Sequence, residues 1–156
     1  MAHKVFLFSL LACLSAPGWA ADLPNPSLTP GAVNGAVTQA NIEQTICVRG
    51  YTKGIRPPAH YTNRLKKEQL AEYGYPDVNP KHYEEDHLIP LEIGGNPTDP
   101  RNLWPEPRLS QYSAKVKDAL ENRLHRLVCS GQVPLLQAQE EIATNWITAY
   151  KKYVNR

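Results

Sequence analysis

The chain has 156 residues, a formal charge of +2 and 42% hydrophobic residues. This length suits one ordinary domain, and the mixed composition excludes a wholly disordered chain, a collagen-like repeat and a multi-span membrane protein. Most of the 14 prolines precede residue 108, so we expect many loops between short elements in the first two thirds of the chain.

Residues 1–20 have the features of a secretory signal peptide. Lys4 supplies a positive start, an apolar run follows, and the small residues Gly18 and Ala20 stand where a signal peptidase cleaves. The run has about ten residues, half of what a transmembrane helix needs, so we expect no membrane span. A lipid anchor on Cys13 is the alternative. The expected location is therefore secreted or periplasmic.

Secretion changes the state that is expected of the cysteines. Cys47 and Cys129 remain after cleavage, and an even pair in an oxidising compartment usually forms a disulfide. Neither belongs to a Cys-x-x-Cys motif of the kind that holds zinc. We expect one disulfide between them, with two buried free thiols as the alternative.

Residues 21–37 are rich in Pro, Asn, Gly and Ser, which predicts a flexible leader before a single domain over 38–156. Thr38 is a suitable N-cap for a short helix reaching Ile46, and the glycines that follow indicate turns. A second helix is predicted from about residue 62 to Tyr73, because Gly74 and a nearby proline end it.

From residue 76 to 107 no helical period is present. The apolar pairs Leu88-Ile89 and Leu103-Trp104 flank Gly94-Gly95-Asn96-Pro97, which indicates a small hairpin. Afterwards apolar residues recur at intervals of three and four over 116–128 and again over 135–153, which predicts two amphipathic helices. The expected fold class is α+β, mostly helical, with a small hairpin.

The densest polar group, Glu84-Glu85-Asp86-His87, leads directly into this hairpin. Neighbouring side chains of a strand point to opposite sides, so Asp86 can hold a hard cation while His87 accepts a proton. Histidine suits the role of general base because its ordinary pKa of about 6.5 leaves it mostly neutral near pH 7. Asn102 returns on the second arm and is a candidate to orient the imidazole.

Residues 84–108 resemble the HNH nucleases of the ββα-metal fold through three motifs: Asp86-His87-Leu88-Ile89-Pro90, Gly94-Gly95 and Asn102-Leu103. Outside this core, Ile46-Cys47-Val48 and Arg56-Pro57-Pro58 are similar to segments of small secreted bacterial members. The resemblance implies a hairpin followed by a helix, with one divalent metal between them.

The resemblance also implies roles for single residues. His87 would be the general base that activates water, Asp86 a metal ligand, and Asn102 the residue that orients the base or braces the loop. The metal would be Mg²⁺, with Mn²⁺ as the alternative. The family's third ligand position falls on Gln111, whose side-chain carbonyl is an unusual ligand. Two acidic residues further along this helix, Asp118 and Glu121, are expected to face solvent.

Basic residues gather between positions 49 and 67, where the chain has no Asp or Glu. Such a strip suits a phosphate backbone, and its affinity should fall with salt. Arg49, Lys53 and Arg56 are the substrate-binding candidates, together with Arg101 next to the motif asparagine.

Two hypotheses of function follow. The first is a secreted or periplasmic, metal-dependent endonuclease that hydrolyses DNA, or RNA, with His87 as general base. The second is a non-catalytic protein of the cell envelope that binds nucleic acid or another polyanion and uses the same hairpin as scaffold. Oligomeric state is left open.

Overall fold

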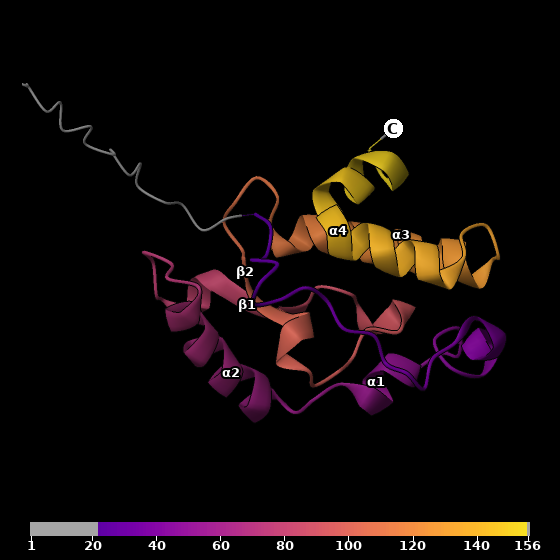
Figure 1. The fold of residues 1–156 in the computed structure, drawn as a ribbon, viewed down its shortest axis with the longest axis horizontal. Coiled ribbons are helices and arrows are strands. Elements are labelled where there is room, and N and C mark those ends of the chain that lie inside the picture. Colours follow the sequence, from indigo (N-terminus) through magenta and orange to yellow (C-terminus); the bar gives the residue numbers. More distant parts are fainter. Residues whose placement is uncertain (1–21, 156) are drawn as a thin grey trace, which may run out of the picture.

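A computed structural model describes residues 22–155, so the expected signal peptide and Cys13 lie outside the described residues. Its centre is a two-stranded antiparallel sheet of β1 (Tyr83–His87) and β2 (Leu103–Pro107), with helices on both sides (Figure 1). The expected class, α+β and mostly helical, is confirmed. The first strand ends before the apolar pair Leu88-Ile89, which was expected to form part of the hairpin. These two residues instead follow β1 as buried loop residues.

The register of the hairpin separates the two motif residues of β1. Asp86 pairs with Trp104, and His87 pairs with Leu103. Because side chains alternate along a strand, Asp86 and Trp104 lie on one face, whereas His87 and Leu103 lie on the other.

The face that carries His87 is covered by α2 (Ala59–Glu72), which begins after two prolines and so starts earlier than predicted. The Nε2 of Gln69 on α2 donates to the carbonyl of Leu103 at 2.8 Å. Gly74 ends this segment with φ at +64°, a conformation that favours glycine. The segment before α2 forms a short helix, α1 (Tyr51–Ile55), where turns were expected.

The other face of the hairpin meets α3 (Ala114–Cys129), and α4 (Leu135–Tyr153) packs alongside α3 (Figure 1). Both helices were predicted from their apolar periodicity. Trp146 of α4 is fully buried in the core between them. The helix α4 is kinked at Asn145, whose Oδ1 accepts from the backbone N–H of Thr148 at 2.9 Å and so caps the second half.

Cys47 and Cys129 form the expected disulfide. Cys47 follows the 3-10 helix η1 (Gln39–Gln44), which Thr38 precedes as N-cap, and Cys129 is the last residue of α3. The bond therefore ties the N-terminal part of the domain to the C-terminal end of α3, 82 residues further along the chain.

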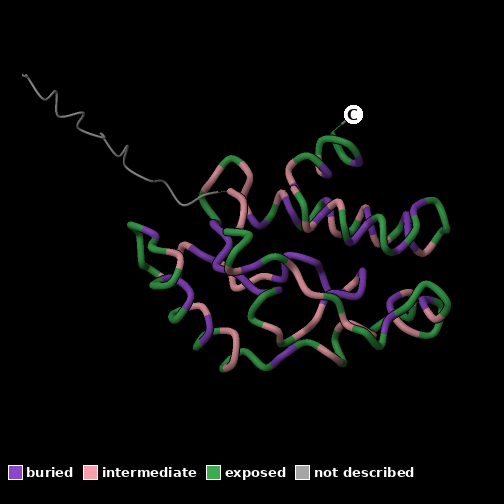
Figure 2. Tube along the Cα trace, viewed as in Figure 1, coloured by how far each residue is buried: buried purple, intermediate pink, exposed green. Residues whose placement is uncertain are grey.

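Residues 22–37 are not the flexible leader that their composition indicates. The hydroxyl of Thr29 donates to the carbonyl of Leu103 at 3.1 Å, and the backbone N–H of Gly31 donates to the carbonyl of Arg101 at 2.9 Å. Val37 belongs to the hydrophobic core. The domain thus includes this segment, and Figure 2 shows buried positions along it.

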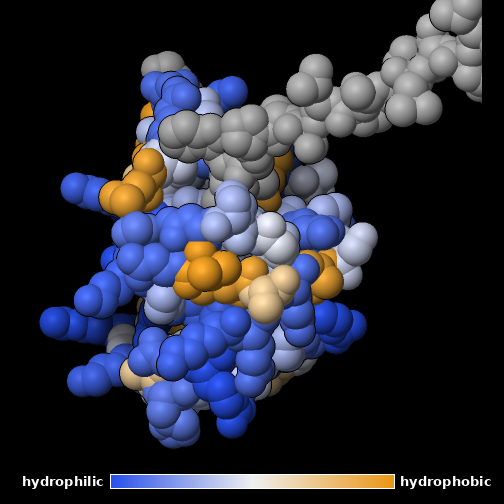
Figure 3. Space-filling model, turned by 90° about the vertical axis from the view of Figure 1, so that its left-hand side faces the viewer, coloured by the Kyte–Doolittle hydropathy of each residue, from blue (hydrophilic) through white to orange (hydrophobic). Residues whose placement is uncertain are grey.

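Among residues 22–155, no helix combines the length and the apolar character needed to cross a membrane. Hydrophilic side chains cover most of the face drawn in Figure 3, with a few separate apolar patches among them.

Candidate functional site

His87 ends β1 with its imidazole directed at the loop that connects the two strands. Its Nε2 lies 3.0 Å from the carbonyl oxygen of Pro97. A carbonyl oxygen can only accept, so Nε2 carries the ring proton and Nδ1 is the acceptor atom of the neutral ring. Burial, with only 4% of the residue exposed, lowers the pKa of His87. The ring is therefore neutral near pH 7 and held in one tautomer.

Asn102 is fully buried and braces the same loop. Its Nδ2 donates to the carbonyls of Ile89 and Asn96, both at 3.0 Å, and its Oδ1 accepts from the N–H of Ile89 at 3.0 Å. The same oxygen accepts from the N–H of Ala32 at 3.3 Å. No hydrogen bond joins Asn102 to the imidazole, so it acts on His87 through the loop that carries Pro97.

The loop closes tightly at Gly95. A Cβ at this position would stand 1.7 Å from the carbonyl oxygen of Ile89, so only glycine fits. Close approach of these two backbone segments is what lets one asparagine bind both of them.

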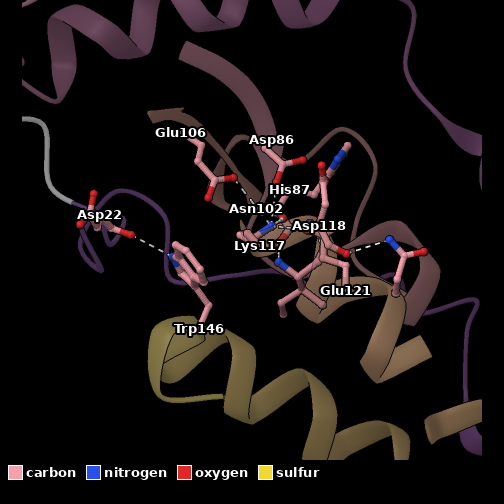
Figure 4. Close-up of polar contacts among 11 residues, drawn as sticks. Asp22, Asp86, His87, Asn102, Glu106, Lys117, Asp118, Glu121 and Trp146 are labelled. Carbon is pink, nitrogen blue, oxygen red and sulfur yellow. Dashed lines mark hydrogen bonds and ion pairs between the residues drawn. The ribbon is translucent and has the colours of Figure 1, made fainter. Parts of the chain in front are cut away.

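Asp86 points from the opposite face of β1 toward α3 and meets Lys117, as Figure 4 shows. The Nζ of Lys117 donates to Oδ2 of Asp86 at 2.6 Å, to the carbonyl of His87 at 2.7 Å, and to Oε1 of Glu121. The Oε2 of Glu106, from β2, lies 4.0 Å from the same Nζ. The Lys117 side chain is fully buried, so this ammonium is shared among acidic groups from two strands and one helix.

The charges of this cluster are strongly coupled. Burial alone would lower the pKa of Lys117, but the surrounding carboxylates outweigh it and hold that pKa well above its usual range. Burial likewise opposes ionisation of Asp86, yet the ammonium of Lys117 keeps its pKa below the usual range. Burial raises the pKa of Glu106 well above its ordinary value and that of Glu121 to about 8. Near neutral pH the cluster is therefore built around an Asp86–Lys117 ion pair.

Sequence reasoning missed Lys117 and Glu106, and it placed Glu121 wrongly on the solvated face. A signal for Lys117 was present: it shares the buried stripe of α3 with Leu120 and Leu124, where a charged residue needs a partner. Glu121, four residues on, is that partner on the same helix. Asp118 is exposed, as expected.

Gln111 lies in the turn before α3 and is exposed, and no hydrogen bond links it to Asp86 or His87 among the described residues. Gln111 therefore does not join Asp86 and His87 in the metal site that the sequence predicted. One oxygen of Asp86 binds a buried ammonium at 2.6 Å, and a divalent ion placed there would face that positive charge. The donor set that remains does not fit a hard divalent ion at Asp86.

A second group of metal-type donors also fails as a metal centre. The donor atoms of Cys47, His125 and Cys129 lie within 4.8 Å of one another. Both sulfurs are joined in the disulfide, so neither is available as a thiolate ligand. His125 instead donates from Nε2 to the carbonyl of Ile46 at 2.9 Å and has a structural role.

Three of the four candidate substrate-binding residues gather around α1. Arg49, Lys53 and Arg56 are exposed, and they form no ion pair with a described residue. Arg101 instead pairs with Asp99, its Nη2 lying 2.7 Å from Oδ2, so its charge is largely neutralised.

Arg56 is the residue of this basic group whose charge acts on His87, where it contributes, after burial and Lys117, to the lowered pKa of the imidazole. It also lines a pocket of about 220 Å³ together with Pro90, Asp118 and Glu121. Arg49 lines a neighbouring pocket of about 310 Å³. A basic edge therefore borders the hairpin loop.

Comparisons of the chain with protein-family models, with curated proteins and with solved structures find no match. Function is therefore inferred from the side chains themselves.

Proposed function

We propose that this protein is a secreted or periplasmic endonuclease that hydrolyses phosphodiester bonds of nucleic acid, with His87 as general base. The observation that carries the proposal is the bond from Nε2 of His87 to the carbonyl of Pro97, at 3.0 Å. It leaves Nδ1 as the proton acceptor of a ring that burial keeps neutral. A neutral imidazole with a fixed tautomer is ready to accept a proton at pH 7.

The reaction requires one water molecule. Its oxygen attacks the phosphorus, its proton passes to Nδ1 of His87, and the bond from phosphorus to the leaving ester oxygen breaks. The leaving oxygen takes a proton from solvent. No step is assigned to a metal, because the residues at Asp86 do not fit one.

Phosphate contacts come from the basic edge around α1. Arg56 is the best placed of these residues, because its charge already acts on His87. A guanidinium binds phosphate oxygens through paired N–H donors and offsets the charge that develops on them. Lys53 and Arg49 extend this edge toward the flanking phosphates of a strand.

A second function, non-catalytic binding of nucleic acid or another polyanion, is favoured by a different observation. His87 is only 4% exposed, and Asp86 is already engaged by Lys117 at 2.6 Å. In that case the basic edge would bind a phosphate backbone, and the hairpin would serve only as scaffold. Binding would weaken steeply as salt rises.

The test is relaxation of supercoiled plasmid by wild type, by His87→Ala and by His60→Ala, with Mg²⁺ in one series and EDTA in another. His60 is an exposed histidine on α2 and provides the matched control. We expect His87→Ala to lose about 100- to 10,000-fold in nicking rate, the usual contribution of a general base, while His60→Ala keeps the wild-type rate.

Equal nicking by wild type and His87→Ala would refute the assigned base. Absence of nicking by all three proteins, with salt-sensitive DNA binding retained, would select the non-catalytic function. Circular dichroism of each protein checks that the variants keep the fold.

A further inference from the structure

The ammonium of Lys117 lies where sequence resemblance leads one to expect a metal ion. We propose that this ammonium replaces the divalent ion in this chain, so that the Asp86 site works without any ion. The proposal concerns the site of the proposed function and rests on it for its catalytic meaning. Its decisive measurement is metal binding, which requires no catalysis.

The ammonium is fully satisfied by the residues around it. A lysine side chain has three N–H donors, and Lys117 has three close acceptors: Asp86, Glu121 and the carbonyl of His87. Its side chain has no exposed surface. It therefore cannot touch a substrate and acts only on its neighbours.

The acceptors of Lys117 are the kind that a hard divalent cation prefers. They are carboxyl oxygens and one backbone carbonyl. The buried carboxyl of Glu106, 4.0 Å from Nζ and beside Asp86, completes these surroundings. Figure 4 shows Lys117 reaching into this set from α3. An oxygen cage is thus present, and a covalently attached cation fills it.

The ammonium also links the two motif residues. It binds the side chain of Asp86 and the backbone carbonyl of His87, and it belongs to the helix that packs against the hairpin. Asp86 is therefore a positioning residue: together with Lys117 it fixes the end of β1, from which the base projects. A metal ion would supply the same positive charge, but it would have to be acquired from solution.

The first experiment measures Mn²⁺ binding by wild type, from the loss of the electron paramagnetic resonance signal of free Mn²⁺ and from the melting temperature. We expect no stoichiometric binding, and the same melting temperature with Mn²⁺ and with EDTA. Binding of one Mn²⁺ by wild type that is lost in Asp86→Asn would overturn the proposal.

The second experiment removes the ammonium. Lys117→Ala should empty the cage and leave the buried Asp86 carboxylate without a counter-ion, so the variant should melt at a lower temperature. We expect Mn²⁺ to raise that melting temperature and to bind more than about 100-fold tighter than to wild type, because a unit charge at about 4 Å has been removed. Lys115→Ala, an exposed lysine on the same helix, should behave as wild type.

Asp86→Asn combined with Lys117→Ala should abolish the response to Mn²⁺. A folded Lys117→Ala that ignores Mn²⁺ would contradict the proposal, and if this variant does not fold, the wild-type titration decides. The two proposals fail separately. If wild type neither nicks DNA nor binds Mn²⁺, only the proposed nuclease function is refuted. If nicking requires Mn²⁺ bound at Asp86, only the proposal that Lys117 replaces the metal ion is refuted.

Discussion

Glu85 offers a sharp test of the electrostatics of the hairpin. It directly precedes Asp86 in β1, has its side chain on the face of the strand opposite that of Asp86, and points toward α2. Both of its carboxylate oxygens are buried, and neither has a hydrogen-bond partner among the described residues. Burial raises the pKa of Glu85 to about 8, although the ammonium of Lys66 acts in the opposite direction.

The raised pKa makes stability depend on pH. In the unfolded chain Glu85 releases its proton near its ordinary pKa of 4.5, whereas the folded protein keeps the proton until about pH 8. Over that range unfolding releases a proton, so the free energy of unfolding falls as pH rises. At about 1.36 kcal/mol per pH unit, the loss attributable to Glu85 reaches at most about 4 kcal/mol at pH 8.

The perturbation is Glu85→Gln, which keeps the shape of the side chain and removes the ionisable group. We expect the variant to lie within about 1 kcal/mol of wild type in urea stability at pH 5, and to be more stable by up to about 4 kcal/mol at pH 8. Glu84→Gln is the matched control, because Glu84 is half exposed on the other face, paired with Arg108. Its difference from wild type should not change between pH 5 and pH 8. Parallel pH profiles of wild type and Glu85→Gln would refute the reasoning.

Three further predictions concern the framework of the site. Replacing both Cys47 and Cys129 by Ala opens a bond that spans 82 residues. This double substitution should lower the free energy of unfolding, measured by urea titration, by about 2–5 kcal/mol. An unchanged free energy of unfolding would mean that packing holds the loop equally well. Asn102→Ala leaves backbone groups of the hairpin loop unpaired and should cost at least about 3 kcal/mol, while the NMR titration of His87 should shift because the loop that sets its tautomer loosens. Gly95→Ala should cost about 1–3 kcal/mol in thermal unfolding, because its Cβ would meet a backbone oxygen at 1.7 Å, whereas a Gly→Ala change at position 54, where nothing lies within 4 Å, should be neutral or stabilising.

The parts of the molecule that were predicted correctly depend on local pattern. The spacing of apolar residues predicted the helices α3 and α4, and the Gly-Gly-Asn-Pro loop predicted the hairpin. The pairing of Cys47 with Cys129 followed from their being the two cysteines that remain after the predicted signal peptide. The opposite directions of Asp86 and His87 followed from the alternation of side chains along a strand.

The parts that were missed depend on contacts between distant segments. Composition indicates a flexible leader over 21–37, yet backbone groups of residues 22–37 find partners near β2, and composition carries no information on such partners. Gln111 was placed by its spacing from Asn102, but the side chain of α3 that reaches Asp86 is Lys117.

The sequence by itself thus determined the helices α2, α3 and α4, the hairpin, the disulfide and the adjacency of a carboxylate and an imidazole, because each follows from periodicity, from compartment or from neighbouring positions. Only the tertiary structure decided that the carbonyl of Pro97 sets the tautomer of His87 and that a buried lysine, not a loop glutamine, faces Asp86. The physical reason is that a buried charge is stable only beside its counter-charge. Which charges meet depends on how α3 packs against the hairpin. Lys117 and Asp86, the pair that meets here, lie 31 residues apart in the chain.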